Sequence, residues 1–337
     1  MSSPQHHDDV DADREWLDQV TERRYEVLRE IGRGGMSRVL LAWDRTQGRK
    51  VALKMLTAGC EASIEERERF RREALITAEA DHPHIVPCYG FVCQGPRAVA
   101  VMRYVPGDSL ADRLAGGARL DPVALLAILV PVADALAHVH RRGVIHRDVK
   151  PANILLHAED GWPFLTDFGI ATLRTSDHSR WEATQRLGTP EFMSPEQALG
   201  AWDADHRSDI YSLGLVAYAG LTGTLPFRGN PLAQAGQRAV RDVPSLSRQA
   251  PDVPKQLAEI VDRCLARNPR RRWRDAGALH RALTCAAQQL EPRVRPQRWW
   301  TRITKAIAGL ERRISGNLPS VSPFAGPAAE TLMSDRD

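Results

Sequence analysis

The stretch that decides the fold is HRDVKPAN, residues 146–153. It follows a long apolar segment that ends in RRGVI, and it precedes the short apolar run ILL. One short loop therefore carries an acid, a base and an amide, namely Asp148, Lys150 and Asn153. A polar turn would explain this composition, but such side chains gathered in one connecting loop more often serve a function. We therefore predict that the loop belongs to a catalytic or binding site.

A second short strand follows in FLTDFGIA, and Asp167 lies at its end, two residues before a glycine. Asn153 and Asp167, at the ends of adjacent strands, can supply oxygen ligands to Mg²⁺. This hard cation is usually held by one or two carboxylates together with phosphates. The two strand ends therefore predict a site for a divalent cation.

Three glycines, Gly32, Gly34 and Gly35, lie in IGRGGMSRV between two predicted strands. The simplest interpretation is a glycine-rich hairpin turn. The functional interpretation is that glycines let backbone N–H groups approach phosphate oxygens closely. A strand follows the loop rather than a helix, which excludes the Rossmann and Walker types of phosphate loop. The pattern points to a hairpin lid over a nucleotide.

Lys54 ends the apolar strand VALK and is one of five lysines among 46 basic residues. A solvated surface lysine is the plain interpretation, but a lysine in a chain that otherwise uses arginine suggests a need for a compact ammonium. Facing the interior, it would require an acidic partner, because an unpaired buried ammonium is costly. Glu73 in FRREAL is the natural candidate. Other acids share the same predicted helix: Glu65, Glu66 and Glu68.

The order of the segments predicts an α+β fold with two lobes. Residues 25–105 are expected to form five antiparallel strands and one main helix, and residues 106–288 a larger, mostly helical lobe, with the hinge near 102–108. Residues 1–24 are acidic and polar, and we expect them to be flexible. Residues 289–337 are a basic appendage, expected to be partly helical and then disordered.

Composition argues against several classes of protein. Apolar residues are 43% and charged residues 26% of the 337, which disfavours collagen-like, coiled-coil and wholly disordered chains. The longest apolar stretch, residues 123–139, contains Pro131, Asp134 and His138, so no transmembrane helix is predicted. The N-terminus lacks the basic start and apolar run of a secretory signal peptide. The five cysteines are odd in number and form no CxxC pair, which argues against a disulfide scaffold and a zinc ribbon. We expect a cytoplasmic, reducing location.

Taken together, these motifs resemble those of bacterial eukaryotic-like (Hanks-type) serine/threonine protein kinases. Seven motifs follow the family's order and approximate spacing from Tyr25 to about Gln288: GRGGMS, VALK, HRDVKPAN, DFG, GTPEFMSPE, DIYSLG and CLARNPRRRW. The resemblance implies a bilobal protein kinase fold. It also implies transfer of the ATP γ-phosphate to Ser or Thr hydroxyls of protein substrates, which can include other copies of this chain.

The resemblance further assigns roles to individual residues. Asp148 would accept the proton of the attacking hydroxyl while Lys150 steadies the γ-phosphate. Lys54, oriented by Glu73, would hold the α- and β-phosphates. The remaining binding residues are Asn153 and Asp167 for Mg²⁺ or Mn²⁺, and, for ATP, Ile31, Gly32, Arg33, Gly34, Gly35, Met36, Ser37, Arg38, Val39, Ala52, Met102, Arg103 and Val105.

Other matches concern support and specificity. Lys150 two residues after Asp148, together with Thr189, is the family's serine/threonine pattern. Glu196 and Arg272 match a buried ion pair that anchors the substrate loop. Asp209 matches an acid that braces the backbone of the HRD loop.

The resemblance also predicts a regulatory phosphorylation site, and it shows where this chain departs from the family pattern. Arg147 matches an arginine that often receives a phosphate on the activation loop, and we favour Thr184 as the phosphorylated residue. Ser37 replaces the third lid glycine, and Arg103 stands where an acid is usual. Neither change removes a catalytic group. ATP is expected to pair with backbone groups of Arg103 and Val105, and Met102 occupies the gatekeeper position.

The resemblance ends before the C-terminal appendage. Residues 298–314 can form a helix with one apolar and one basic face. Such a helix could rest on anionic lipid or dock a partner, or simply pack on the large lobe. Its short basic run, without interleaved aromatics, argues against nucleic acid.

Two rival functions remain open at this stage. A pseudokinase would bind nucleotide or partners without turnover, but Lys54, Glu73, Asp148, Asn153 and Asp167 are all present. A small-molecule phosphotransferase is disfavoured by the complete GTPEFMSPE motif, which in the family contacts peptides.

Overall fold

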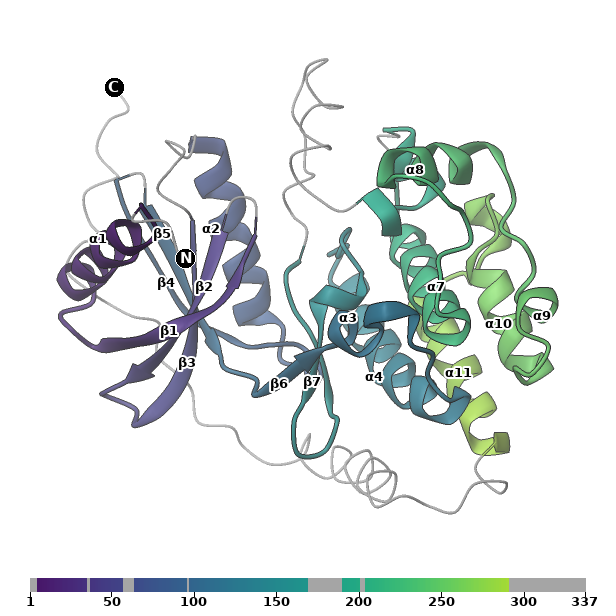
Figure 1. The fold of residues 1–337 in the computed structure, drawn as a ribbon, viewed down its shortest axis with the longest axis horizontal. Coiled ribbons are helices and arrows are strands. Elements are labelled where there is room, and N and C mark those ends of the chain that lie inside the picture. Colours follow the sequence, from purple (N-terminus) through teal and green to yellow (C-terminus); the bar gives the residue numbers. More distant parts are fainter. Residues whose placement is uncertain are drawn as a thin grey trace. The chain divides into compact units, whose positions relative to one another are not determined.

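The computed structural model describes residues 5–34, 37–56, 64–95, 97–168, 190–200 and 204–290 of the 337. These residues all belong to one unit, Met1–Arg295. The predicted order of an antiparallel sheet followed by a helical lobe is confirmed (Figure 1). Residues 298–314, for which a helix is predicted, lie outside the described residues.

The first lobe is a five-stranded antiparallel sheet with the predicted helix against it. The strands lie in the order β1-β2-β3-β5-β4. Their bounds are β1 Tyr25–Arg33, β2 Ser37–Asp44, β3 Arg49–Leu56, β4 Cys88–Gln94 and β5 Arg97–Arg103, and helix α2 spans Ile64–Glu79.

Strand β3 shows how the sequence assigns side chains to the two faces of this sheet. Successive side chains of a strand point to opposite faces. Val51, Leu53 and Met55 enter one core cluster, whereas Ala52 and Leu56 enter the other. Lys54 shares its parity with Ala52 and Leu56, so β3 directs its ammonium towards α2 and the second lobe.

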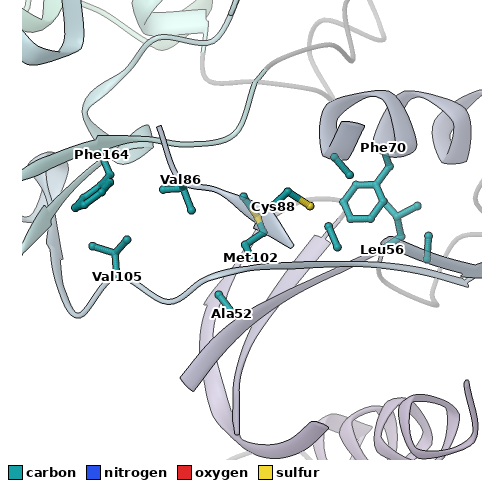
Figure 2. Packing of buried hydrophobic residues seen from close by; sticks show 11 residues of the cluster. Ala52, Leu56, Phe70, Val86, Cys88, Met102, Val105 and Phe164 are labelled. Atoms are coloured by element: carbon teal, nitrogen blue, oxygen red, sulfur yellow. The ribbon is translucent and has the colours of Figure 1, made fainter. Parts of the chain in front are cut away.

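The core cluster on the Lys54 side joins the two lobes. Figure 2 shows Ala52 and Met102 on neighbouring strands, Phe70 on α2, and Phe164 on β8 (Pro163–Leu165) of the second lobe. Burial of these apolar side chains stabilises the first lobe and fixes the hinge against the second at the same time.

The second lobe begins with a small sheet and continues with helices. Its strands, in the order β6-β7-β8, span Gly107–Ser109, Ile154–His157 and Pro163–Leu165. Its α-helices are α3 Leu110–Arg113, α4 Pro122–His140, α6 Pro195–Ala198, α7 Arg207–Thr222, α8 Pro231–Val240, α9 Leu246–Gln249, α10 Lys255–Cys264 and α11 Ala276–Leu290. Short 3-10 turns are η1 Ala115–Gly117, η2 Pro151–Asn153, η4 Pro190–Phe192 and η5 Pro269–Arg271.

Local signals define the ends of the longer helices. Asp121 caps α4 by accepting the Val123 N–H at 2.8 Å, and Pro122 occupies the first turn, where its missing N–H costs nothing. Helix α7 ends at Gly223, which adopts a left-handed φ of 76°. These residues mark the start of α4 and the end of α7.

The chain leaves the hinge through Gly107, where only glycine fits. Its φ is 134°, and a Cβ there would lie 2.0 Å from the Leu156 carbonyl oxygen. The close approach lets β6 pair with β7, the strand that follows the HRDVKPAN loop. Backbone bonds also tie the lobes directly, since Val86 N–H donates to Leu165 O at 3.0 Å.

Helix α4 is long and apolar enough to cross a membrane by length and composition alone. In the fold it is the central helix of the second lobe, and 67% of its most apolar window is buried against other elements. A core helix passes the same test of hydropathy, so α4 is explained by packing.

The expectation that residues 1–24 are flexible is wrong for Gln5–Val20, which form helix α1. Trp16 and Leu17 of this helix are buried in the core cluster on the face of the sheet opposite Lys54. The segment is acidic overall, but Trp16 and Leu17 belong to one apolar stripe of the helix. The physical reason for the helix is that this stripe has an apolar sheet face to cover.

Candidate active site

Lys54 joins two elements that are far apart in the sequence. Its Nζ donates to Glu73 Oε1 at 2.7 Å and to Asp167 Oδ1 at 3.0 Å. Strand β3 supplies the lysine, α2 supplies Glu73, and the segment after β8 supplies Asp167. Glu73 of α2 pairs with Lys54, as predicted.

Burial and charge set the protonation of this group. Burial opposes the charge on Lys54, but the carboxylates of Asp167 and Glu73 outweigh it and raise the pKa of the ammonium. Burial would raise the pKa of Asp167, yet Lys54 holds it below its ordinary value. For Glu73, burial raises the pKa and Lys54 only partly offsets this. Two carboxylates around one ammonium leave an excess of negative charge that favours a cation.

The HRDVKPAN loop brings its three reactive side chains together. Asp148 Oδ2 accepts from Lys150 Nζ at 2.8 Å and from Asn153 Nδ2 at 3.0 Å. Asn153, in η2, also donates to the Asp148 carbonyl at 2.8 Å, which fixes the amide plane. The predicted constellation is thus present, with Asp148 at its centre.

Asn153 and Asp167 offer the donor set that a hard cation prefers. The Asn153 amide nitrogen is used by Asp148, so its oxygen is the atom left for a ligand. Among the described residues, no group of three or more His, Cys, Asp or Glu side chains is arranged for a metal. One carboxylate and one amide match an ion that takes its remaining ligands from phosphates and water.

Asp209 on α7 braces the HRD loop from beneath, as predicted. Its carboxylate accepts the His146 N–H at 2.8 Å and the Arg147 N–H at 2.7 Å, and it contacts His140 Nε2 at 2.7 Å. Burial would raise the pKa of Asp209, but these bonds hold it below its ordinary value. His146 in turn contacts the Thr166 carbonyl at 3.0 Å, which couples the HRD loop to the segment carrying Asp167.

Backbone strain marks the same two segments. Arg147 and Asp167 adopt left-handed φ angles of 66° and 57°. Residues other than glycine rarely occupy this region, and such conformations persist where the surroundings enforce them. The Asp209 bonds on one side and the Lys54 bond on the other supply that enforcement.

The predicted hairpin is formed by β1 and β2. Ile31 and Val39 pack on the cluster that contains Ala52, Met102 and Val105, so an apolar surface lies below the lid. Gly34 N–H donates to Ser37 O at 2.7 Å and closes the turn. Gly32 pairs with Val39 across β1 and β2. Gly35 and Met36 lie outside the described residues.

Two lid arginines that the sequence analysis assigned to ATP binding form ion pairs with acids of this chain. Arg33 is exposed and pairs with Glu30 at 2.8 Å. Arg38 is buried on the opposite face of the sheet from Val39 and forms an ion pair with Asp13 of α1. Neighbouring residues of a strand face opposite ways, so only the backbone of Arg38 is available to the lid.

The hinge contains Arg103 at a position where an acid is usual in the family. The Arg103 N–H donates to Pro87 O at 3.0 Å, and its guanidinium lies over the Phe164 ring, 4.9 Å from the centroid. Met102 is buried beside Ala52 of β3. The side chain of Arg103 therefore packs on the second lobe.

Glu196 of α6 and Arg272 form the predicted buried ion pair. The guanidinium makes two bonds to the carboxylate, at 2.7 and 2.8 Å, and its side chain is 0% exposed. Burial would raise the pKa of Glu196, but Arg272 lowers it below its ordinary value. The pair fixes the substrate-loop end to the helical lobe.

Replacing Glu196 with Gln is expected to lower the free energy of unfolding by about 2–3 kcal/mol at pH 7, because Arg272 stays buried without its charged partner and keeps only its backbone carbonyl acceptors and the amide oxygen. A carboxylate with a depressed folded pKa stabilises above its unfolded pKa, about 4.3, and this contribution disappears as the pH falls through the folded value. Urea denaturation should therefore show the difference shrinking below about pH 4. Glu259→Gln, at an exposed position of α10, is the control.

Arg238 on α8 is a residue that sequence reasoning missed. Its buried guanidinium donates to Met193 O at 3.0 Å and to Pro190 O, and so holds the backbone of the substrate-loop segment. Burial lowers the pKa of Arg238. No motif marks it, and α8 itself was not predicted. Thr189 and Thr184 lie outside the described residues.

The comparisons with known proteins agree with this geometry. The model of the protein kinase domain matches residues 25–283. The chain belongs to the protein kinase family. Its relatives include serine/threonine-protein kinase pkn2 of Myxococcus xanthus, 39% identical over 80% of this chain and 33% of that protein, and PrkC of Bacillus subtilis, 37% identical over 75% of this chain and 39% of that protein.

Solved structures of kinases support the same assignment. The chain is similar to a crystal structure of a double mutant of the Mycobacterium tuberculosis PknI kinase domain, with a TM-score of 0.64 and 31% identity over 79% of this chain and 96% of that one. This kinase chain spans only about a third to two fifths of the length of pkn2 and PrkC. Protein kinases use ATP with a divalent metal ion and act on proteins.

Proposed function

We propose that the chain is an ATP-dependent serine/threonine protein kinase. The observation that carries the proposal is Lys54, which bridges Glu73 and Asp167, while Asp148, Lys150 and Asn153 meet in the braced HRD loop. Phosphoryl transfer depends mainly on positioning and charge neutralisation, and these residues are arranged for both. A pseudokinase would not require all of them together.

Each side chain has a task that suits its surroundings. Asp148 accepts the proton of the incoming hydroxyl, and its bonds to Lys150 and Asn153 orient the carboxylate. Lys54 stays charged and holds ATP phosphates, with Glu73 fixing its position. A divalent ion held by Asn153 and Asp167 would neutralise charge on the phosphates. Mg²⁺ is the proposed ion, with Mn²⁺ as the alternative.

Serine and threonine are the proposed acceptors. Lys150 lies 2.8 Å from Asp148, in the arrangement that resembles serine/threonine kinases, and the curated relatives pkn2 and PrkC are named as such. Other copies of this chain are proposed substrates, with Thr184 as the favoured site. Arg147, which lies in the HRD loop, is the proposed recipient of that phosphate.

The proposal is tested with purified full-length chain, ATP, MgCl₂ and a generic protein substrate. Peptide mass spectrometry locates the phosphates on both proteins. Phosphates on Ser and Thr residues are expected. Absence of transfer with either Mg²⁺ or Mn²⁺, or transfer to Tyr alone, would contradict the assignment.

The segment 298–314 has a proposed role of its own, docking to anionic lipid or to a partner through the apolar and basic faces that its sequence predicts. Co-sedimentation with liposomes containing anionic lipid compares the full chain with a version that ends at Leu290. Equal failure to sediment removes the membrane hypothesis.

A further inference from the structure

Helix α1 covers the face of the sheet that points away from the nucleotide side. Asp13, Trp16, Leu17 and Val20 recur at helical spacing, and the first three are buried. Trp16 and Leu17 pack with strand residues of β2, β3 and β5, and Val20 packs against the same cluster. Figure 1 shows α1 and α2 on opposite sides of the five-stranded sheet.

An ion pair lies within this apolar contact. Arg38 Nη1 is 3.1 Å from Asp13 Oδ2, and the two side chains are 2% and 1% exposed. Removing two charges from water is costly, so such a pair adds little to stability compared with apolar residues. The pair does make the position of α1 on the sheet specific, because any other position would separate the buried charges of Asp13 and Arg38.

Arg38 is part of the lid. It is flanked by Ser37, whose carbonyl closes the lid turn, and by Val39, which packs on the nucleotide side. Across the sheet it lies in register with Arg33 of β1 and Met55 of β3. A side chain anchored at this point restrains the first residues of β2, and with them the turn that must close over phosphates.

We propose that α1 braces the nucleotide lid and that Asp13 is a positioning residue for ATP, acting through Arg38. The docked helix holds β2 in place from behind, so that Val39 and the turn at Gly34 and Ser37 are preset for the nucleotide. The role in ATP binding rests on the proposed kinase function. The mechanical role of the brace does not.

The first test uses hydrogen exchange of the full chain without nucleotide. Asp13→Asn keeps the size of the side chain and leaves Arg38 without its charged partner. We expect backbone amides in residues 31–41 to exchange about 10-fold faster, which corresponds to about 1.4 kcal/mol in the local opening equilibrium. Amides of α10, in the other lobe, should exchange at the parent rate.

Matched variants separate the brace from a general loss of stability. Asp18→Asn makes the same chemical change at an exposed position of α1 and is expected to exchange like the parent. If Asp13→Asn does not fold, Leu17→Ala, which removes apolar contact from the same helix face, carries the same measurement. Faster exchange confined to the lid supports the brace.

The second test is nucleotide binding. Calorimetric titration with ATP and Mg²⁺ is expected to give a Kd about 5- to 10-fold higher for Asp13→Asn, and steady-state kinetics a higher KM for ATP with kcat changed less than about twofold. A purely structural role would lower the melting temperature without this split.

The two ideas fail in different ways. Lid exchange and ATP affinity equal to the parent in both Asp13→Asn and Leu17→Ala, with the parent still transferring phosphate, would overturn the brace. A parent chain that transfers no phosphate contradicts the kinase assignment, and the exchange experiment on the free chain then still decides the brace.

Discussion

Replacing Asp148 with Asn is expected to lower kcat by about 10²–10⁴-fold, the range that a positioned general base contributes. The amide cannot take the proton of the acceptor hydroxyl. Asn keeps the shape of the side chain and an oxygen that can accept from Lys150 and Asn153, so the loop should keep its structure. Initial rates with a protein substrate at saturating ATP measure the effect.

The control for Asp148 is Asp108→Asn in β6, which makes the same change at an exposed carboxylate. It should retain the parent rate. In calorimetric titration Asp148→Asn should bind ATP with the Kd of the parent. In thermal unfolding it should have the melting temperature of the parent. A variant that transfers phosphate within about threefold of the parent rate would remove Asp148 from the mechanism, since a base contributes far more than that.

Replacing Lys54 with Met is expected to lower kcat/KM for ATP by about 10²–10³-fold, as for loss of one preorganised charge-stabilising donor. The ammonium bridges Glu73 and Asp167, so its loss removes the phosphate contact and also leaves two carboxylates close together. The matched control is Lys50→Met, an exposed lysine on the same strand.

The stability of Lys54→Met should also depend on pH. Without the ammonium, the folded pKa of Glu73, which is already raised, rises further, and the folded pKa of Asp167 rises above its unfolded value. Such groups stabilise below the unfolded pKa, and that contribution is lost as the pH rises through the folded value. We expect the free energy of unfolding to be about 2 kcal/mol lower than that of the parent at pH 7. This decrease is smaller than the roughly 3–5 kcal/mol usual for breaking a fully buried ion pair, because Asp167 is 39% exposed. Urea denaturation at pH 4 should show a smaller loss, and an equal loss at both pH values would contradict the charge argument.

Much of the site could be predicted because its residues are fixed by local patterns. The alternation of β3 directs Lys54 to the side of α2, and the apolar strands around HRDVKPAN bring Asp148 and Asn153 to the end of β7. Glu73 could be singled out from its neighbours only by the family resemblance. The structure then shows the reason, because Glu73 lies on the face of α2 that meets β3.

The residues that escaped prediction act through contacts distant in sequence. Asp13 belongs to an acidic segment without a strong apolar pattern, and nothing local shows that Arg38 lies beneath it. Arg38 was assigned to ATP because its neighbours carry the lid motif, although the parity of β2 would have placed it on the other face. Arg238 lies on a helix that the sequence analysis did not predict, and its partners are backbone carbonyls, which leave no mark in the sequence.

The most direct test of the kinase assignment is intact-mass analysis of the purified chain during incubation with ATP and Mg²⁺. Parent chain, Asp148→Asn, and a distinguishable mixture of the two are followed in parallel. The account predicts that the parent gains phosphoryl groups, that Asp148→Asn alone gains none, and that Asp148→Asn gains them when the parent is added. A parent chain that gains no phosphate, alone or with a generic protein substrate, or an Asp148→Asn variant that gains phosphate at the parent rate, would contradict it.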